Sequence, residues 1–135
     1  MKNIKGLFLM TVGCVFMFFT SALAQDPQVK SFTPIIKPQV TFVELGSTSC
    51  IPCRLMQPVM RSVESRFGSQ VKVIFYDVSS SEQRRYAAVY SIRLIPTQVF
   101  LNSAGKEFFR HEGFFPEAEI TKLLKSQGLK PLNNN

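Results

Sequence analysis

Short apolar runs alternate along the chain with segments of helical periodicity. Runs rich in β-branched and aromatic residues are typical of strands, whereas apolar positions three and four residues apart indicate a helix. We expect strands at 40–45, 71–76, 97–101 and 106–110. We expect helices from about Cys50 to Phe67, at 82–90 and at 116–126.

This order of elements predicts the connectivity of a sheet. The first strand, the long helix and the second strand form a βαβ unit, which implies parallel strands and a right-handed crossover. Residues 102–105 form a hairpin turn, so the last two strands should be antiparallel. The fold class is therefore α/β, with a central mixed sheet of about four strands flanked by helices.

The first 24 residues have the layout of a secretory signal peptide. Lys2 and Lys5 precede an apolar run at 6–20, and 21–24 end in small residues suited to cleavage. The run is shorter than the ~20 residues that comfortably span a bilayer, and an uncleaved anchor is the alternative. Cys14 lies within the run and would be removed with it. We therefore expect export to a bacterial periplasm or the exterior, with no stable membrane span after cleavage.

The rest of the chain divides by composition. Residues 25–37 are a proline-containing lead-in segment, 38–128 carry the predicted elements, and 129–135 are a polar tail. A chain of 135 residues that is 45% hydrophobic allows one globular domain. The net charge of +7 includes two lysines of the signal peptide, and the remaining basic residues are scattered. Without a basic stripe that contains aromatic residues, we expect no nucleic-acid partner.

One motif carries chemistry: Cys50-Ile51-Pro52-Cys53, directly after a strand and at the start of a helix. The two sulfurs lie one helical turn apart, which is close enough for a disulfide. The free N–H groups and positive dipole end of a helix N-terminus stabilise a thiolate, here on Cys50. Pro52 is tolerated in the first turn, where its missing N–H costs little. Since the thiolate attacks in thiol–disulfide exchange, this placement indicates a redox-active pair.

Three other interpretations of the motif fit the sequence less well. A purely structural disulfide would close a very short loop and stabilise the fold only weakly. A zinc site normally needs four ligands, and after loss of Cys14 the chain keeps only Cys50, Cys53 and His111. Covalent haem attachment needs C-x-x-C-H, but residue 54 is Arg. We expect neither a metal nor a cofactor.

From Phe42 onward the sequence resembles the thioredoxin superfamily. The similarity covers about residues 38–127 and rests on Phe42–Leu45 before the C-I-P-C motif, on Pro58, and on Tyr90-Ser-Ile-Arg-Leu-Ile-Pro-Thr97. It is carried further by the hairpin after these residues and by Gly113. The resemblance implies a thioredoxin-like fold whose first strand and helix are reduced, because the lead-in segment is short.

The resemblance also implies roles for individual residues. Cys50 would be the exposed nucleophile, and Cys53 the buried thiol that resolves a mixed disulfide. Pro96 would be the family's cis-proline, between Ile95 and Thr97, with the Ile95 backbone available to an extended substrate segment. The alternative is an ordinary trans proline at the start of a strand.

Glu44 lies six residues before Cys50, where the family often carries a buried acid. Desolvation would raise its pKa and suit it to proton exchange with Cys53. The alternative is a strand glutamate that faces solvent. Two departures from the family stand out: the chain has no Trp, and Phe75 stands where many thioredoxins have a lysine near the acid.

Together these features predict a thiol–disulfide oxidoreductase that acts on protein disulfides. The Ile-Pro dipeptide lacks the histidine of strongly oxidising relatives, which favours a reductase supplied by a membrane-bound electron donor. The alternative is a client-binding or assembly module, for example in cytochrome maturation, in which the cysteines are not essential. We expect His111 to be a partly exposed residue at a strand end. For Arg54, a role near Cys50 and an ordinary solvated arginine remain equal alternatives.

Overall fold

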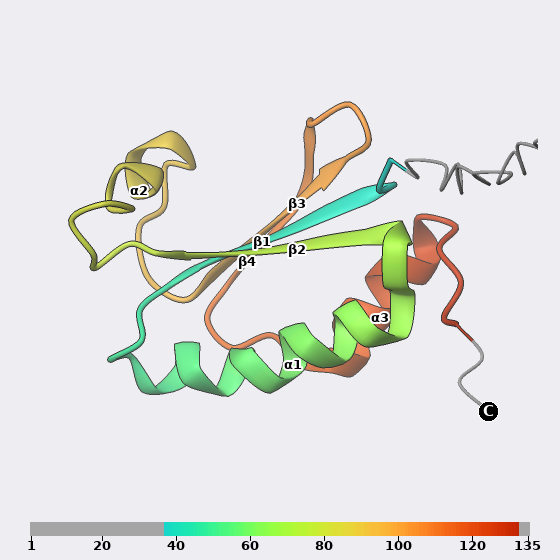
Figure 1. The fold of residues 1–135 in the computed structure, drawn as a ribbon, viewed down its shortest axis with the longest axis horizontal. Helices are drawn as coiled ribbons and strands as arrows, with labels where there is room; N and C mark the ends of the chain where they lie inside the picture. Colours follow the sequence, from blue (N-terminus) through green and yellow to red (C-terminus); the bar gives the residue numbers. More distant parts are fainter. Residues whose placement is uncertain (1–36, 133–135) are drawn as a thin grey trace, which may run out of the picture. The chain divides into compact units, whose positions relative to one another are not determined.

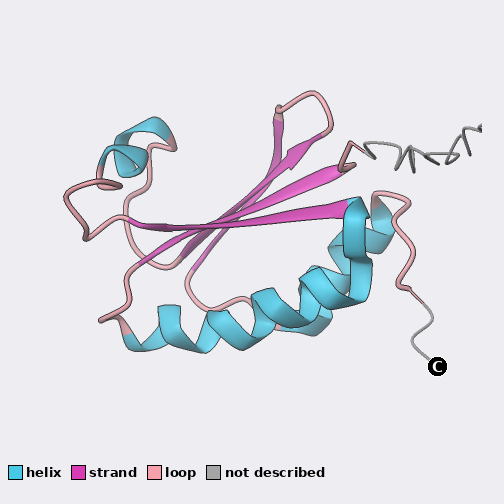
Figure 2. Ribbon diagram, viewed as in Figure 1, coloured by secondary structure: helices cyan, strands magenta, loops and turns pink. Residues whose placement is uncertain are grey.

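A four-stranded sheet forms the centre of the fold in the computed structural model, which describes residues 37–132 (Figures 1 and 2). The strands are β1 Val40–Gly46, β2 Val71–Asp77, β3 Thr97–Asn102 and β4 Glu107–Glu112. The helices are α1 Ile51–Phe67, α2 Arg85–Val89 and α3 Glu117–Ser126, with a 3₁₀ turn at Gly68–Gln70. The predicted signal peptide at 1–24 and the lead-in up to residue 36 lie outside the described residues. The predicted reduction of the family's first strand and helix concerns the same residues.

The strand order is β2-β1-β3-β4. β1 pairs with β2 in parallel, so the βαβ crossover through α1 is confirmed. β3 is antiparallel to both β1 and β4. The predicted mixed sheet of four strands is therefore correct, and β1 is one of its two central strands.

The core lies between the sheet and one helical layer. In Figures 1 and 2, α1 and α3 run along the same side of the sheet. Phe42 of β1 and Phe100 of β3 are directly opposite each other, and their rings stack with centroids 4.7 Å apart. They pack with the apolar side of α1, which buries Met56, Met60, Val63 and Phe67. This packing of an amphipathic helix fixes the start of α1 at the end of β1.

The opposite face of the sheet carries a smaller cluster. Val43, Leu45 and Val99 are buried there, and tyrosines pack against them. The rings of Tyr76 and Tyr86 stack with centroids 3.6 Å apart, which anchors α2 to β2. Among residues 37–132, no helix is both long and apolar enough to cross a membrane.

Two boundaries differ from the sequence prediction. The helix expected at 82–90 begins only at Arg85, because side chains hold the preceding residues in turns. Gln83 accepts from the Asp77 backbone N–H at 2.8 Å, and Ser80 Oγ accepts from the Gln83 N–H at 3.2 Å. The first bond ties Gln83 back to the end of β2. The backbone bonds from Tyr86 to Gln83 and from Ala87 to Arg84 span three residues, so a turn precedes the α-helix.

The polar tail expected at 129–135 begins too early. Leu129 is 2% exposed and belongs to the main core cluster. The Leu132 backbone N–H donates to the Arg66 carbonyl at 2.7 Å, so residues up to 132 pack against the end of α1. Residues 133–135 lie outside the described part of the chain.

Candidate active site

Cys50 and Cys53 lie at the N-terminus of α1 and are joined by a disulfide with 5.2 Å between their Cα atoms. Cys50 is the N-cap residue, and its Sγ accepts a hydrogen bond from the Cys53 backbone N–H at 3.3 Å. Cys53 is fully buried, whereas Cys50 is partly exposed. The pair therefore consists of one accessible and one inaccessible sulfur.

The first turn of α1 favours negative charge on Cys50. It contains no acidic residue, so nothing within the turn opposes the positive end of the helix dipole. Pro52 occupies the start of the helix, where no hydrogen bond is lost. When the disulfide is reduced, the N–H of Cys53 remains a donor for the Cys50 sulfur, which lowers the free energy of its thiolate.

Ser47 fixes the turn that leads to Cys50, a role that the sequence did not indicate. Ser47 is 3% exposed, and its Oγ lies 2.9 Å from both Ser49 Oγ and Ser79 Oγ. Its carbonyl accepts from the Cys50 backbone N–H at 3.2 Å. Only the spatial approach of Ser79 from the loop after β2 distinguishes Ser47 from an ordinary turn serine.

A cavity of about 370 Å³ lies beside this turn. Its lining consists of Ser47, Thr48, Arg54, Gln57 and Phe75. The Arg54 side chain is exposed at this cavity, so it adds positive charge to the surroundings of the motif.

Glu44 is completely buried, so the solvent-facing alternative for this residue is wrong. Residues two apart in a strand share a face, and Glu44 lies between Phe42 and Gly46, both of which face α1. Burial raises the pKa of Glu44 from 4.5 to about 8, and the side-chain amide of Gln98 acts in the opposite direction. An acid in this state can take up and release a proton near neutral pH.

The Ile95–Pro96 peptide bond is cis. Thr97 is opposite Leu45 in the antiparallel register, and one further step along both strands brings Pro96 opposite Gly46, which adjoins Cys53. Pro96 is buried and Ile95 is partly exposed. The loop that carries Ile95 therefore lies at the same end of the strands as the cysteine pair.

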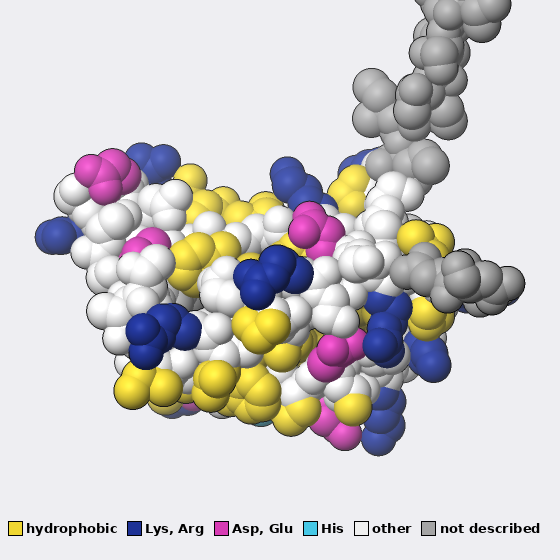
Figure 3. Space-filling view, turned by 60° about the horizontal axis from the view of Figure 1, so that its bottom comes forward, with side chains coloured by type: hydrophobic (Ala, Val, Ile, Leu, Met, Phe, Trp, Pro, Cys, Tyr) yellow, Lys and Arg dark blue, Asp and Glu magenta, His cyan; other side chains and the backbone are white. Residues whose placement is uncertain are grey.

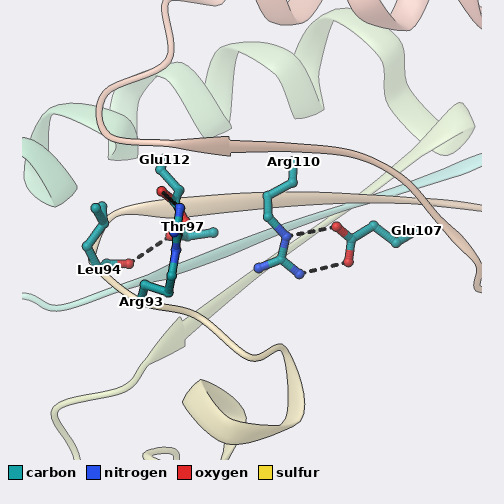
Figure 4. Close-up of polar contacts among 6 residues, drawn as sticks. All are labelled: Arg93, Leu94, Thr97, Glu107, Arg110 and Glu112. Carbon is teal, nitrogen blue, oxygen red and sulfur yellow. Dashed lines mark hydrogen bonds and ion pairs between the residues drawn. The ribbon is translucent and has the colours of Figure 1, made fainter.

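Polar contacts hold this loop in position (Figure 4). Thr97 Oγ1 donates to the Leu94 carbonyl at 2.7 Å. The guanidinium of Arg93 makes two hydrogen bonds to the carboxylate of Glu112, at 2.8 and 3.2 Å. The pKa of Glu112 is lowered by this partner. Arg93 thus ties the loop to the end of β4.

Apolar side chains are exposed near the motif. Ile51 is 65% exposed, Leu55 56% and Phe114 43%. Figure 3 shows hydrophobic side chains gathered along one margin of the face that carries α1, with Lys and Arg side chains elsewhere on the same face.

His111 lies in β4 as a partly exposed residue, and its ring stacks on Phe115 at 4.2 Å. Phe108 and Phe109 are partly buried against the core, whereas Phe114 remains exposed. Within residues 37–132, no group of three or more His, Cys, Asp or Glu side chains is arranged to hold a metal ion.

The sheet, the helix that covers it and the paired cysteines at the start of that helix define a thioredoxin-type redox fold. A family described as the thioredoxin-like domain matches residues 26–128. The chain therefore belongs to the thioredoxin-like family.

Individual relatives agree with this assignment. Thioredoxin 1 of Synechococcus elongatus is 31% identical over 105 residues, covering 78% of this chain and 90% of that protein. A thioredoxin-like protein of Synechocystis is 27% identical over 105 residues, covering 76% of this chain and 97% of that protein. The X-ray structure of Fasciola hepatica thioredoxin is 26% identical with a TM-score of 0.59, covering 68% of this chain and 84% of that one. The protein is a thioredoxin-like redox protein, and its homologues and CxxC pair support thiol–disulfide oxidoreductase activity.

Proposed function

We propose that the protein is an exported thiol–disulfide oxidoreductase that exchanges disulfides with protein clients through Cys50 and Cys53. One observation carries the proposal: an accessible sulfur at the N-cap of α1 is disulfide-bonded to a buried sulfur one turn later. This asymmetry suits a reaction in which the accessible sulfur attacks the client disulfide and the buried sulfur attacks only the mixed disulfide that results.

In the reducing direction, the Cys50 thiolate attacks one sulfur of a client disulfide. A Cys50–client disulfide forms, and the other client sulfur leaves as a thiolate that takes a proton from solvent. Glu44, as carboxylate, accepts the proton of the Cys53 thiol, and the Cys53 thiolate attacks Cys50 Sγ. The Cys50–Cys53 disulfide forms, the second client sulfur leaves, and two electrons have passed to the client.

Ile95, Pro96 and Thr97 would guide the client. Ile95 is partly exposed and lies at the end of the strands where the cysteines are, so its backbone is placed to pair with an extended client segment. Ile51 and Leu55 supply exposed apolar contacts beside the disulfide.

The direction of exchange in the cell is proposed from the motif. Ile51 and Pro52 provide no imidazole next to Cys50 to stabilise its thiolate further, so the pair should not be a strong oxidant. An oxidising compartment keeps such a pair as a disulfide unless electrons are supplied. We therefore propose a membrane-bound electron donor that reduces Cys50–Cys53.

Export is proposed from residues 1–24 alone, with an uncleaved anchor as its alternative. The intact mass of the protein purified from the cell envelope fraction tests both. Loss of residues 1–24 supports cleavage, while retention of these residues indicates an anchor. A lipid adduct on Cys14 would contradict the assignment of that cysteine to the discarded peptide.

The second candidate is a client-binding or assembly module in which the cysteines are dispensable. The exposed Ile51, Leu55 and Phe114 favour it, because they offer an apolar docking surface whether or not the sulfurs react. A Cys50→Ser, Cys53→Ser double variant that fully complements a deletion strain would support this candidate.

The direct test is reduction of insulin with dithiothreitol as electron source. The wild type should accelerate insulin precipitation, and Cys50→Ser should abolish the acceleration. Ser103→Ala is the control, since this exposed serine lies in the turn between β3 and β4 and takes no part in the proposed exchange. In Cys53→Ala, a client trapped on Cys50 should be identifiable by mass spectrometry. Equal rates for the wild type and Cys50→Ser would overturn the proposal.

A further inference from the structure

Glu44 has one buried polar neighbour on the adjacent strand β3, Gln98. The two residues are directly opposite each other in the antiparallel pairing of β1 and β3, and both are 0% exposed. Directly opposite residues have Cβ atoms about 4.5–5.5 Å apart on the same face, within reach of a glutamate and a glutamine. A second buried polar side chain, on the neighbouring strand, therefore lies beside the acid.

The other neighbours of Glu44 offer little polarity. On β2 its partner is Phe75, and on α1 the sulfur of Cys53 is bonded to Cys50. Arg54 is exposed at a cavity that Phe75 also lines. On β4, His111 is opposite Gln98 and one strand further from Glu44, and its Nε2 lies 3.2 Å from the Phe114 carbonyl oxygen. Gln98 is thus the polar group next to the carboxyl, and His111 is the next titratable one in the row.

The hydrogen bonds of Gln98 leave a donor available. Its Nε2 donates one N–H to the Gly113 carbonyl at 3.0 Å, and a side-chain amide has a second N–H. Within the described residues, neither carboxyl oxygen of Glu44 has a hydrogen-bond partner, and neither has Oε1 of Gln98. Buried polar atoms nearly always have a hydrogen-bond partner, from the protein or from ordered water, so these three atoms require an explanation.

We propose that Gln98 is a positioning residue for Glu44: the Gly113 carbonyl orients the Gln98 amide, and its second N–H is donated to the Glu44 carboxylate when the acid is ionised. The inference rests on the proposed role of Glu44 as the proton acceptor for Cys53. A hydrogen bond from a neutral donor to a buried ion is stronger than one between neutral groups. Gln98 therefore makes the ionised form accessible in a site where burial disfavours it.

This arrangement explains why a buried carboxyl can still cycle between its two forms. Burial alone raises the pKa of Glu44, and the Gln98 amide limits the rise. Without the amide, the acid would hold its proton to higher pH, so a smaller fraction of Glu44 would be present as the carboxylate that accepts the Cys53 proton. The Gly113 carbonyl gives the amide a fixed orientation, because it occupies the first N–H.

The test is a titration of the Glu44 side-chain carboxyl by carbon NMR in the oxidised protein, in which Cys50 and Cys53 do not titrate. Gln98→Met keeps the length of the side chain and removes the amide. Gln70→Met is the matched control, because the Gln70 amide also holds backbone carbonyls, at Phe67 and Lys130, but at the opposite end of the sheet. Both variants are repeated with His111→Gln to exclude a change in the charge of the imidazole.

We expect Gln98→Met to move the Glu44 transition upward by about one pH unit, since one hydrogen bond to an ion is lost. Gln70→Met should leave the transition unchanged, and the result should persist with His111→Gln. If Gln98→Met does not fold, Gln98→Asn replaces it, because the shorter amide cannot reach Gly113 and Glu44 together, and the same upward shift is expected. A transition that stays in place, moves downward or moves equally in Gln70→Met overturns the inference.

The inference and the proposed function can fail separately. Insulin reduction by Gln98→Met should show the same upward shift in its pH profile. A shift in the NMR titration without a shift in activity would retain Gln98 as the positioning residue and remove Glu44 from the exchange reaction. An unchanged NMR titration with activity that still depends on Glu44 would retain Glu44 as the proton acceptor. It would remove Gln98 as the residue that positions it.

Discussion

Gly46 lies directly against Cys53. A Cβ atom at Gly46 would lie 3.1 Å from the Cβ of Cys53, 3.2 Å from its Sγ and 3.2 Å from the ring of Phe75. These distances are shorter than ordinary van der Waals contacts, so Gly46 is the residue that lets α1 approach β1 closely enough to bury Cys53. The position of the buried Cys53 sulfur thus depends on the absence of a Cβ atom at residue 46.

We expect Gly46→Ala to destabilise the protein by roughly 1–3 kcal/mol, as overpacking in a filled core does. It should also slow thiol–disulfide exchange, because Cys53 must shift. Urea unfolding and insulin reduction measure the two effects. Gly105→Ala is the comparison: its added Cβ would meet nothing within 4 Å, and only its positive φ of +77° would be strained. Unchanged exchange in Gly46→Ala would contradict the close contact.

The buried Glu44 should make stability fall as pH rises. Its pKa of about 8 in the folded protein exceeds the ordinary value of 4.5, so the folded state binds the proton more tightly. The contribution of protonated Glu44 to the free energy of unfolding is therefore complete below about pH 4.5. It is lost as the pH rises through about 8. The pKa difference corresponds to at most roughly 5 kcal/mol. Urea unfolding from pH 5 to 9 should show a weaker pH dependence in Glu44→Gln than in the wild type. Identical slopes would mean that Glu44 is ionised at neutral pH.

Gly68 should resist substitution at the end of α1. Its φ is +54°, and a Cβ there would lie 2.8 Å from Cδ1 of Leu132. We expect Gly68→Ala to cost about 1–3 kcal/mol, because a backbone conformation reserved for glycine is combined with a clash. The double variant Gly68→Ala, Leu132→Ala should recover the part due to the clash. Urea unfolding measures both, and no loss in the single variant would show that residues 129–132 do not pack as described.

The sequence indicated the strands, the long helix and the cysteine pair because each has a local signal. The run of β-branched and aromatic residues around Phe42 is typical of a strand, and the spacing of apolar residues around Met56 is typical of a helix. The C-I-P-C motif can be interpreted from its immediate neighbours. The turns before Arg85 were missed because Ser80 and Gln83 resemble a helix start until their side-chain bonds are known. Leu129 was assigned to a tail because the residues after it are polar.

The supporting residues of the site depend on register, which single-sequence reasoning does not supply. Gln98 was recognised only as part of a strand, and nothing in the order of residues pairs it with Glu44. In the sequence, Gly46 and Ser47 are only small residues after a strand. In the structure, Gly46 permits the close approach of Cys53, and Ser47 fixes the turn that leads to Cys50. Contacts between segments far apart in the chain decide these roles.

The central claim is that Cys50, once reduced, is held as a reactive thiolate while Cys53 is shielded. The most direct measurement is alkylation of the reduced protein with iodoacetamide at pH 7, with the modified cysteine located by peptide mass mapping. The account predicts that Cys50 reacts at least about fivefold faster than free cysteine, since a helix N-terminus lowers the thiol pKa, and that Cys53 remains largely unmodified. Equal reactivity of Cys50 and free cysteine, or faster labelling of Cys53, would contradict it.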